Sequence, residues 1–485
     1  AIATWHTRLT DLCSESDAAL VSTVLSCVQS ASHRVGVDCN DWAQDANFIA
    51  DSLDIGLILI ELKVDVQALC AGLLYRAVRE QRLSVESVRR QFGGAVEALV
   101  VGVLKMADVA DAQQFTSTAV LGQPQSSNDN LRQMLVAMVD DVRVALIKLA
   151  ERTCAIRVVK NDEQRRERLA AEVSGLYVPL AHRLGIGQLK WELEDLAFRY
   201  TQTSVYKRIA KLLDGKRVER DRYIRRVSQT VDTALKEANV SADINGRAKH
   251  IFSIWKKMQR KGIGFSQVHD VRAIRILVPT VQDCYTTLGA IHGLWRTIPN
   301  EFDDYIANPK PNGYRSLHTA VIGPEGKVLE VQVRTREMHD EAELGVCAHW
   351  RYKHSDRASS SVYEEKIEWL RQALHWHDEA GATGSIAESL QFDADYDRVF
   401  VFTPKGDIVN LVQGATPLDF AYHVHTQIGH RCKGARVNGS LVPLNQALRT
   451  GDRVHIITSE APIPKREWLN ADAKWVVTSR AKAQI

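Results

Sequence analysis

The chain has 485 residues, of which 45% are hydrophobic and 25% are charged, as in ordinary globular proteins. This length predicts roughly three domains, and a net charge of +3 is too small to indicate a polyanionic partner by itself. The eight cysteines form no CxxC pair, which argues against a structural zinc site and indicates a reduced protein. No signal peptide and no apolar run near ~18 residues is evident, so we expect a cytoplasmic protein without a membrane span.

The first 200 residues have the apolar spacing of helices. In GQLKWELEDLAFRY (187–200), apolar residues recur every three or four positions with charges between them. Similar periodicity covers 53–79, where scattered charges favour a buried pair of helices over a membrane span, and 141–157. We therefore expect an all-helical domain over residues 1–200.

From about residue 240 the pattern changes to strands flanked by helices. VRAIRILVP (271–279) is rich in β-branched residues and ends at proline. LEVQVR (329–334) alternates, with its apolar residues on one side and its polar residues on the other, and GPEGK (323–327) predicts the turn before it. We expect an α+β domain over residues 201–353, with one open sheet face that carries polar groups.

The segment 301–335 combines an acidic cluster, a lysine, an aromatic residue and a further carboxylate. These groups suit a nucleoside polyphosphate bound with a divalent metal. Asp270 and Glu330 fall on neighbouring strands and can share Mg²⁺, although an isolated carboxylate more often only pairs with an arginine. Tyr314 follows the turn Asn312-Gly313 and can stack on a purine, or can instead be a core residue of the next strand.

The stretch 245–262 is basic and amphipathic. Its arginines can stack on a base or bind phosphate, and its lysines act as point charges. A solvated basic helix face is the plainer interpretation. Nucleic-acid binding is the weaker functional one, because interleaved exposed aromatic residues are missing.

A linker with a short helix is expected over 354–392, followed by a third domain over 393–460. The order strand–strand–helix–strand–strand predicts a ubiquitin-like β-grasp fold. Its helix begins at Thr416-Pro417, an N-cap followed by proline, and Asn438-Gly439 is a strong hairpin signal. Residues 461–485 are expected to begin a C-terminal region that is truncated here.

These motifs resemble the RelA/SpoT family of long (p)ppGpp synthetases. HDVRAIRILV, NPKPNGYRSLHTAV, LEVQVRT and MHDEAELGVCAHWRYK are similar to the synthetase domain, and VFVFTPKGDIVNL with TPLDFAYHVHTQIGHRC is similar to the TGS domain. The resemblance implies a multidomain α and α+β protein with an all-helical HD-type domain, a nucleotidyltransferase-like α+β synthetase domain and a β-grasp TGS domain. The implied reaction transfers pyrophosphate from ATP to the 3′-OH of GDP or GTP, giving ppGpp or pppGpp and AMP.

The resemblance also implies residue roles. Asp270 and Glu330 match the catalytic magnesium carboxylates, and Glu330 is the candidate to accept the 3′-OH proton. The residues matched to ATP binding are Arg247, Lys249, Lys257 and Arg275, and those matched to GDP or GTP binding are Lys310, Asn312, Tyr314 and His318.

Glu301, Asp303 and Asp304 match the acidic ExDD motif of synthetase-only members, where bifunctional members carry a basic RxKD. Carboxylates near the pyrophosphate path would repel it unless a further cation bridges the two. We therefore expect a second Mg²⁺ near Asp303 or Asp304.

The HD-type domain of the family hydrolyses the same product with a metal held by histidine and aspartate. Here Asp51, Tyr75, Arg76 and Glu151 stand where those ligands belong, so neither imidazole is kept. We expect a pseudo-hydrolase domain with a structural or regulatory role.

In the TGS domain, His430 and Arg431 are candidates to contact the 3′ end of uncharged tRNA on a ribosome, against an ordinary β-grasp surface. Three other functions stay open: a bifunctional synthetase–hydrolase, a non-catalytic tRNA- or ribosome-binding factor, and an enzyme that transfers NMP. The preference between GDP and GTP and the oligomeric state do not follow from the sequence.

Overall fold

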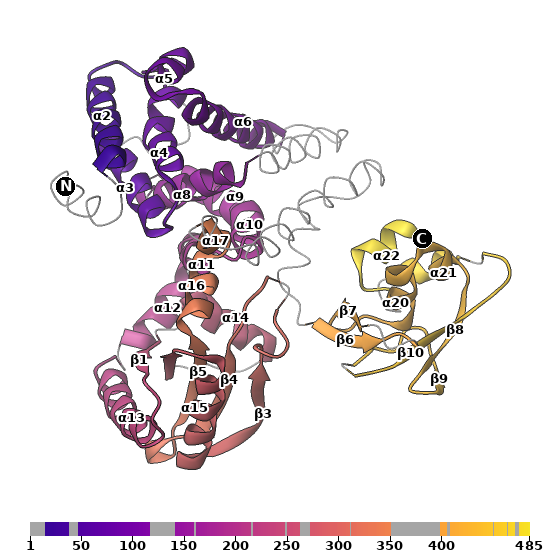
Figure 1. Ribbon diagram of the computed structural model, residues 1–485. Coiled ribbons are helices and arrows are strands. Elements are labelled where there is room, and N and C mark those ends of the chain that lie inside the picture. The colour runs from indigo at the N-terminus through magenta and orange to yellow at the C-terminus, as the bar shows by residue number, and fades with distance from the viewer. Residues whose placement is uncertain are drawn as a thin grey trace. The chain divides into compact units, whose positions relative to one another are not determined.

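The computed structural model describes thirteen segments that fall into two compact units (Figure 1), the first ending at Trp350 and the second starting at Arg398. The segments are 15–37, 47–116, 141–159, 162–214, 217–247, 250–261, 272–310, 312–350, 398–404, 408–449, 451–462, 464–470 and 475–485. Lys249, Asp270 and the expected linker 354–392 lie outside them. Among the described helices, none has the length and apolar character that crossing a membrane requires.

The first unit begins with helices, as the sequence predicts. They are α2 Glu15–Ser32, α3 Phe48–Glu61, α4 Val66–Arg79, α5 Val85–Phe92, α6 Gly94–Thr116, α8 Val142–Val158, α9 Glu163–Glu172, a π-helical turn Val173–Tyr177, α10 Val178–Arg183, α11 Gly187–Thr201, α12 Thr203–Asp214 and α13 Arg217–Glu237. The predicted pair over 53–79 is α3 and α4. The side chains of Asn47 and Asp65 cap these two helices by accepting hydrogen bonds from backbone amides of their first turns.

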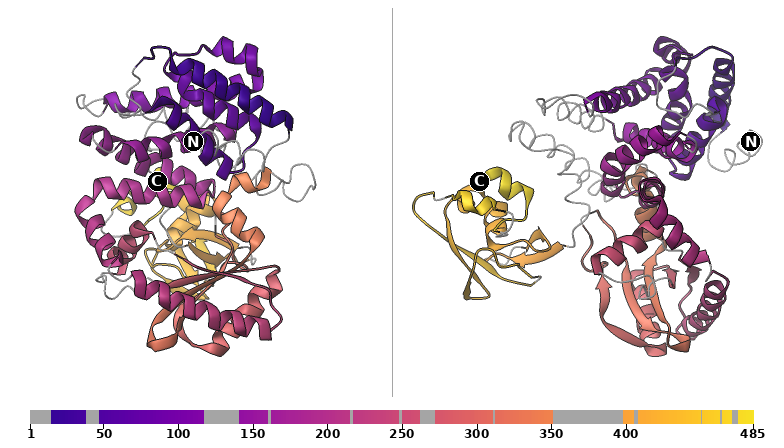
Figure 2. Two further views of the ribbon diagram at one scale, coloured as in Figure 1. Left: turned by 90° about the vertical axis from the view of Figure 1, so that its left-hand side faces the viewer. Right: turned by 180° about the vertical axis from the view of Figure 1, so that it is seen from behind.

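A five-stranded sheet follows in the same unit. Its strands are β1 Asp243–Gly246, β2 Ala273–Val278, β3 Arg296–Asp304, β4 Leu317–Ile322 and β5 Val328–Thr335, in the spatial order β1-β2-β5-β4-β3. Only β2 and β5 pair in parallel. The accompanying helices are α14 Ile251–Lys261, α15 Val281–Leu294, α16 Arg336–Leu344 and α17 Val346–Trp350. Helices α13 and α15 pack on the apolar face of the sheet, as the views in Figure 2 show.

The polar face of the sheet is less open than the sequence predicts. Gln332 and Arg334 are only 2% and 1% exposed, although both lie on the polar side of β5. Helix α16 contacts β5 and β2, and its side chains bind Arg334. The expectation of an open face was therefore wrong at these two positions, because a helix that follows β5 covers them.

The second unit is a β-grasp fold. It contains β6 Arg398–Phe402, β7 Ile408–Val412, α20 Pro417–Val424, α21 Thr426–His430, β8 Cys432–Val437, β9 Ser440–Val442, β10 Val454–Thr458, a 3₁₀ turn Arg466–Leu469 and α22 Ser479–Gln484. Thr416 and Asp419 form a capping box at the start of α20, as its sequence predicts. Asn438 and Gly439 have the positive φ values of a tight hairpin. Three strands follow the first helix in place of the two expected, because the chain returns from this hairpin as the short strand β9.

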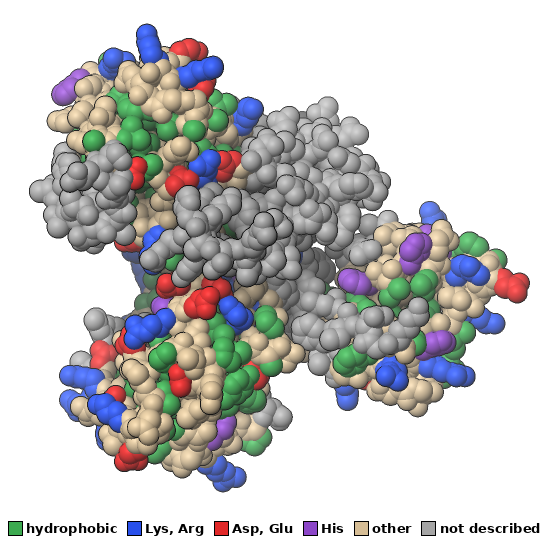
Figure 3. All heavy atoms as spheres, viewed as in Figure 1, with side chains coloured by type: hydrophobic (Ala, Val, Ile, Leu, Met, Phe, Trp, Pro, Cys, Tyr) green, Lys and Arg blue, Asp and Glu red, His purple; other side chains and the backbone are tan. Residues whose placement is uncertain are grey.

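On the face shown in Figure 3, acidic and basic side chains are interspersed over the first unit, whereas basic and histidine side chains predominate on the second. The net charge of the whole chain is only +3. Any strongly charged site must therefore be local.

Candidate nucleotide site and degenerate metal site

One residue from each strand of the five-stranded sheet forms a continuous row. Asn245, Arg275, Gln332, His318 and Asp303 are successive register partners across β1, β2, β5, β4 and β3. Register partners point to the same face of a sheet. We call these five residues the polar row; the other face of the sheet is the apolar core.

Glu330 lies on the same face of β5, two residues before the polar row. Its carboxylate accepts a hydrogen bond from the Gln332 amide at 2.9 Å and lies 3.6 Å from the Arg247 guanidinium. The Arg247 amide bonds the Ala273 carbonyl at 2.9 Å, so the β1–β2 ladder continues and carries Arg247 to this face. Glu330 thus lies close to Arg247, and on the same sheet face as Arg275 of the neighbouring strand β2.

Asp270, the expected partner of Glu330 in magnesium binding, lies outside the described residues. Within the described ranges, no group of three or more His, Cys, Asp or Glu side chains is arranged as a metal-ligand set. The Glu330 carboxylate itself suits Mg²⁺, which prefers oxygen ligands and usually takes few of them from protein.

Tyr314 is positioned by a tight turn. The Gly313 amide bonds the Lys310 carbonyl at 2.8 Å, and Gly313 has a φ of +80°, which favours glycine. The Asn312 side chain accepts a hydrogen bond from the Tyr314 amide at 3.1 Å. The Tyr314 hydroxyl lies 2.8 Å from Nε2 of His318, so the turn is tied to the polar row.

His318 is held in the neutral form. Burial lowers the pKa of its imidazole to about 3, with nearby Lys310, Arg247 and Arg334 adding to the effect and Glu330 opposing it. A neutral ring can accept the hydrogen bond of the Tyr314 hydroxyl or donate one to a ligand.

The acidic motif on β3 splits between the two faces of the sheet. Asp303 belongs to the polar row. Asp304 is engaged elsewhere: it accepts hydrogen bonds from the amides of Ile306 and Ala307 at 3.0 and 2.8 Å and from the Tyr285 hydroxyl of α15 at 3.0 Å. Of these two aspartates, only Asp303 lies on the face of the polar row. Glu301 is exposed on the same strand.

Helix α14, which carries Lys257, is anchored by α11 through contacts that sequence reasoning missed. Asp195 accepts hydrogen bonds from the amides of Ile251 and Phe252 at 3.3 and 2.8 Å and so caps α14. The Trp191 ring stacks on His250 with centroids 5.4 Å apart, and the Arg247 guanidinium lies 5.8 Å from the same indole. These partners are more than fifty residues apart in sequence, and no local signal relates them.

Sequence reasoning missed two further groups, the buried Arg334 and the partly buried Glu343. Arg334 donates to Nδ1 of His339 at 2.6 Å and to Glu343 at 3.1 Å, both on α16. Arg275 of the polar row lies 3.4 Å from the same Glu343 carboxylate. Burial, followed by the charge of Arg334, lowers the pKa of Arg275 to about 10. The alternation of β5 could have indicated Arg334, which shares a face with Glu330.

Three regions of the chain match known protein families. Residues 246–357 match the region found in RelA / SpoT proteins, residues 32–187 match the HD domain and residues 399–458 match the TGS domain. The chain is 48% identical to the GTP pyrophosphokinase of Photobacterium angustum and 47% identical to that of Escherichia coli strain K12. Each comparison extends over 431 residues, which is 88% of this chain. The chain belongs to the RelA/SpoT family.

The chain spans 58% of the length of these two relatives. Among solved structures, small alarmone synthetase 1 of Bacillus subtilis bound to pppGpp matches with 20% identity, over 36% of this chain and 96% of that one. Its TM-score is 0.25. A TM-score this low supports no conclusion about the fold or function of this chain.

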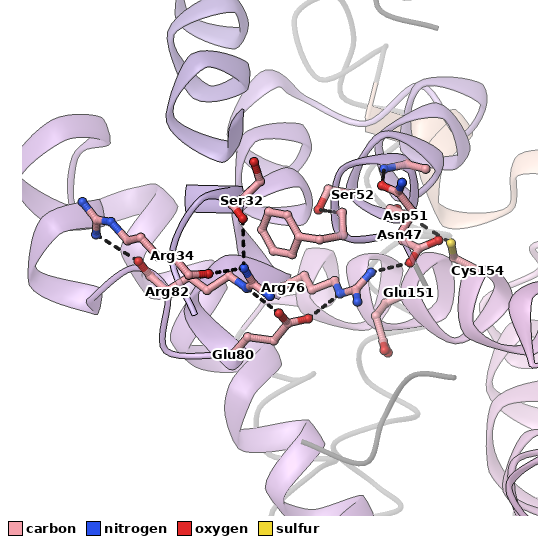
Figure 4. A network of polar contacts seen from close by, with 12 residues as sticks. Ser32, Arg34, Asn47, Asp51, Ser52, Arg76, Glu80, Arg82, Glu151 and Cys154 are labelled. Atoms are coloured by element: carbon pink, nitrogen blue, oxygen red, sulfur yellow. Dashed lines mark hydrogen bonds and ion pairs between the residues drawn. The ribbon is translucent and has the colours of Figure 1, made fainter. Parts of the chain in front are cut away.

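In the HD domain of this RelA/SpoT chain, Arg76 lies at the centre of a network of polar contacts (Figure 4), among the residues that the sequence analysis matches to metal-ligand positions. Arg76 of α4 pairs with Asp51 of α3 and, through Nε, with Glu80 at 2.5 Å. Glu80 also binds Arg82 at 2.6 Å. Asp51 and Arg76 are 3% and 5% exposed. Burial raises the pKa of Asp51, and Arg76 opposes that rise.

The remaining degenerate positions are also paired with cations. Glu151 of α8 binds Lys148 at 2.9 Å and Arg152 at 2.6 Å. The Tyr75 hydroxyl lies 3.4 Å from the Lys148 ammonium. Figure 4 shows Glu151 in the same region as Asp51 and Arg76. The carboxylates of Asp51 and Glu151, two of the residues expected at metal-ligand positions, are thus held in ion pairs.

In the TGS domain, the two tRNA-contact candidates have partners within their own unit. Nδ1 of His430 lies 3.2 Å from the Tyr422 hydroxyl, and burial raises the pKa of Tyr422 to about 12. Nε of Arg431 donates to the Ser459 carbonyl at 2.7 Å. Both side chains remain partly exposed.

Proposed function

We propose that this chain is an alarmone synthetase, which transfers the β,γ-pyrophosphate of ATP to the 3′-OH of GDP or GTP. The observation that carries this proposal is the polar row together with its neighbours. Arg247 and Arg275 flank one side of Glu330, and the Tyr314–His318 pair lies across the row from them. Cations that suit a polyphosphate and an aromatic ring that suits a purine therefore meet on one sheet face.

In this proposal Glu330 accepts the proton of the 3′-OH. The 3′ oxygen then forms a bond to the β-phosphorus of ATP, the bond from that phosphorus to the oxygen bridging to the α-phosphate breaks, and AMP leaves with that oxygen. Such transfer depends mainly on alignment and charge neutralisation. Asp270 and Glu330 would hold Mg²⁺, which neutralises phosphate charge, and Asp303 is the better placed aspartate for a second ion.

We assign the ATP side to Arg247, Lys249, Lys257 and Arg275, and the GDP or GTP side to Lys310, Asn312, Tyr314 and His318. Incubation with γ-labelled ATP, GDP or GTP and Mg²⁺, followed by separation of the products, tests the reaction. We expect label in ppGpp or pppGpp and unlabelled AMP. Release of labelled pyrophosphate would instead indicate NMP transfer and overturn the proposal.

The hydrolase reaction is absent in this proposal, because the Arg76 guanidinium lies between carboxylates where a metal would have to bind. We expect no release of pyrophosphate from ppGpp in the presence of Mn²⁺. Release that depends on Mn²⁺ would support the bifunctional alternative. A non-catalytic factor would instead show tRNA binding with no alarmone formation, and the variant Asp270→Asn would then change nothing.

We further propose that the TGS domain contacts uncharged tRNA on the ribosome through His430 and Arg431. The partly exposed imidazole and guanidinium suit a terminal sugar and phosphate. Stalled ribosomes with uncharged tRNA should bind the chain, and His430→Ala should weaken that binding. Equal binding of both proteins would contradict this assignment.

A further inference from the structure

Arg334 is a cation buried between strand β5 and helix α16. A side chain that only filled this space would ordinarily be apolar. It is 1% exposed and is among the largest fully buried side chains of the described residues. Its Nε atom, like that of Arg275, is buried without a hydrogen-bond partner within the described part of the chain. Burying a guanidinium is costly unless its partners compensate for the lost water. The contacts that Arg334 does make should therefore explain its presence.

Those contacts lead toward both sides of the proposed nucleotide site. Toward the ATP side, Arg334 donates to Glu343 at 3.1 Å, and Glu343 also binds Arg275, 3.4 Å away. Toward the guanosine side, the Arg334 guanidinium lies 5.9 Å from the centre of the Tyr314 ring. Within the described residues, two guanidiniums thus share one carboxylate.

Arg334 is too deeply buried to reach a substrate itself. It can, however, fix the groups that do reach one. Its hydrogen bond with neutral His339, an imidazole whose pKa burial lowers to about 4, fixes the guanidinium against α16. In that position it orients the Glu343 carboxylate toward Arg275 and supports one side of the Tyr314 ring.

We propose that Arg334 is a positioning residue that, through Glu343 and Tyr314, holds the ATP-side arginine and the guanosine-side tyrosine in one fixed arrangement. This inference rests on the proposed function. It predicts that Glu343 acts on the ATP side alone, whereas Arg334 acts on both sides. A simple ion pair that joins β5 to α16 would change stability without distinguishing the two substrates.

The test measures KM for ATP at saturating GDP and KM for GDP at saturating ATP. Glu343→Gln keeps the size of the side chain and removes its charge. We expect it to raise KM for ATP about tenfold and to leave KM for GDP within about twofold. Arg334→Lys keeps the charge and loses the planar fork, so it should raise both KM values by about tenfold.

The matched control is Glu341→Gln. Glu341 lies on the same helix and pairs with Arg315 at 2.7 Å, and within the described residues it forms no hydrogen bond or ion pair with Arg275 or Tyr314. We expect both KM values of this variant to stay within about twofold of the wild type. If Glu341→Gln and Glu343→Gln changed the KM values equally, the Glu343 contact would serve only the stability of the fold, and the inference would be overturned.

An unchanged or lowered KM for ATP in Glu343→Gln would also overturn it, because Glu343 would then only offset positive charge. If Arg334→Lys does not fold, Glu343→Gln still decides the ATP side. If the wild-type chain made no alarmone, that result would contradict the proposed function and not this inference. Calorimetric titration of the same variants with ATP and with GDP then tests the inference, which fails if Glu343→Gln binds ATP as the wild type does.

Discussion

Two buried clusters of charge in the first unit differ in how they are balanced. In the HD domain, Arg76 lies between the carboxylates of Asp51 and Glu80, so the cation has anionic partners on two sides. On the polar face of the sheet, Arg275 and Arg334 share the single carboxylate of Glu343. The first cluster carries its own counter-ion, whereas the second has an excess of cation.

Under the proposed function, this difference separates a former metal site, now occupied by the Arg76 guanidinium, from a site that binds a nucleotide. A guanidinium fixed between carboxylates replaces the charge of a metal and leaves no position for one. Arg334 and Arg275, whose buried Nε atoms have no hydrogen-bond partner in the described part of the chain, lie near the aromatic ring of Tyr314 and favour an anionic ligand. The two clusters should therefore respond differently to substitution and to pH.

The largest expected effect is on the chemistry of the polar face. Glu330→Gln removes the proposed proton acceptor and one expected magnesium ligand while keeping the shape of the side chain. We expect the rate of alarmone formation to fall by about 10³-fold. Initial rates with saturating ATP and GDP measure this loss.

The control for that variant is Glu325→Gln, in the turn before the same strand, where the carboxylate pairs with Arg226 at the surface. Its rate should equal that of the wild type. A loss smaller than about tenfold in Glu330→Gln would move the proton acceptor to another residue.

The next largest effect concerns the ion pairs of Arg76 in the HD domain. Arg76→Ala leaves Asp51 and Glu80 buried without that cation, and we expect the free energy of unfolding to fall by about 3 kcal/mol. Urea denaturation followed by circular dichroism measures the change. Arg89→Ala is the matched control, because Arg89 pairs with Glu97 at 3.6 Å on the surface, and it should cost about 0.5 kcal/mol or less. Equal costs would show that the Arg76 pairs contribute no more than a surface pair does.

The two clusters should also respond to acid with opposite signs. Burial lowers the pKa of His318 to about 3 and that of His339 to about 4, so the stability that these neutral rings contribute above pH 6.5 is lost as the pH falls toward those values. Burial raises the pKa of Asp51 above its usual value of 3.8. Protonation of this carboxyl as the pH falls therefore stabilises the folded HD domain. Hydrogen exchange at pH 7 and pH 5 should show protection lost in β4, β5 and α16 and kept in α3 and α4. Equal losses in both regions would contradict these signs.

The sequence predicts the elements of both clusters better than their contacts. Apolar periodicity and capping residues such as Asp65 and Thr416 define helices locally, and the alternation along β5 identifies its two faces. The burial of Gln332 and Arg334 could not be predicted, because alternation is the same for a solvated polar face and for one covered by a helix. The link from Trp191 to Arg247 likewise depends on tertiary packing.

The degenerate metal site shows the same limit. Comparison with the family's motifs indicates that Tyr75 and Arg76 replace ligands, and so predicts the loss of the metal. The pairing of Arg76 with Asp51 depends on how α3 and α4 pack, whereas Glu80 and Arg82 are close to Arg76 in sequence. The residue types at these positions predict that a metal cannot bind, whereas the packing of the helices decides which side chains contact Arg76.

The smallest effect tests the guanosine side of the polar face. Tyr314→Phe keeps the ring that is expected to stack on guanine and removes only the hydroxyl, which lies 2.8 Å from His318. The loss of one neutral hydrogen bond of about 1 kcal/mol should raise KM for GDP about fivefold. Tyr314→Ala also removes the stacking surface and should raise it further, by about tenfold or more. Neither variant should alter KM for ATP, because Arg275 keeps its pairing with Glu343 in both. If both variants raised KM for GDP equally, the hydroxyl and not the ring would be the group that recognises the nucleotide.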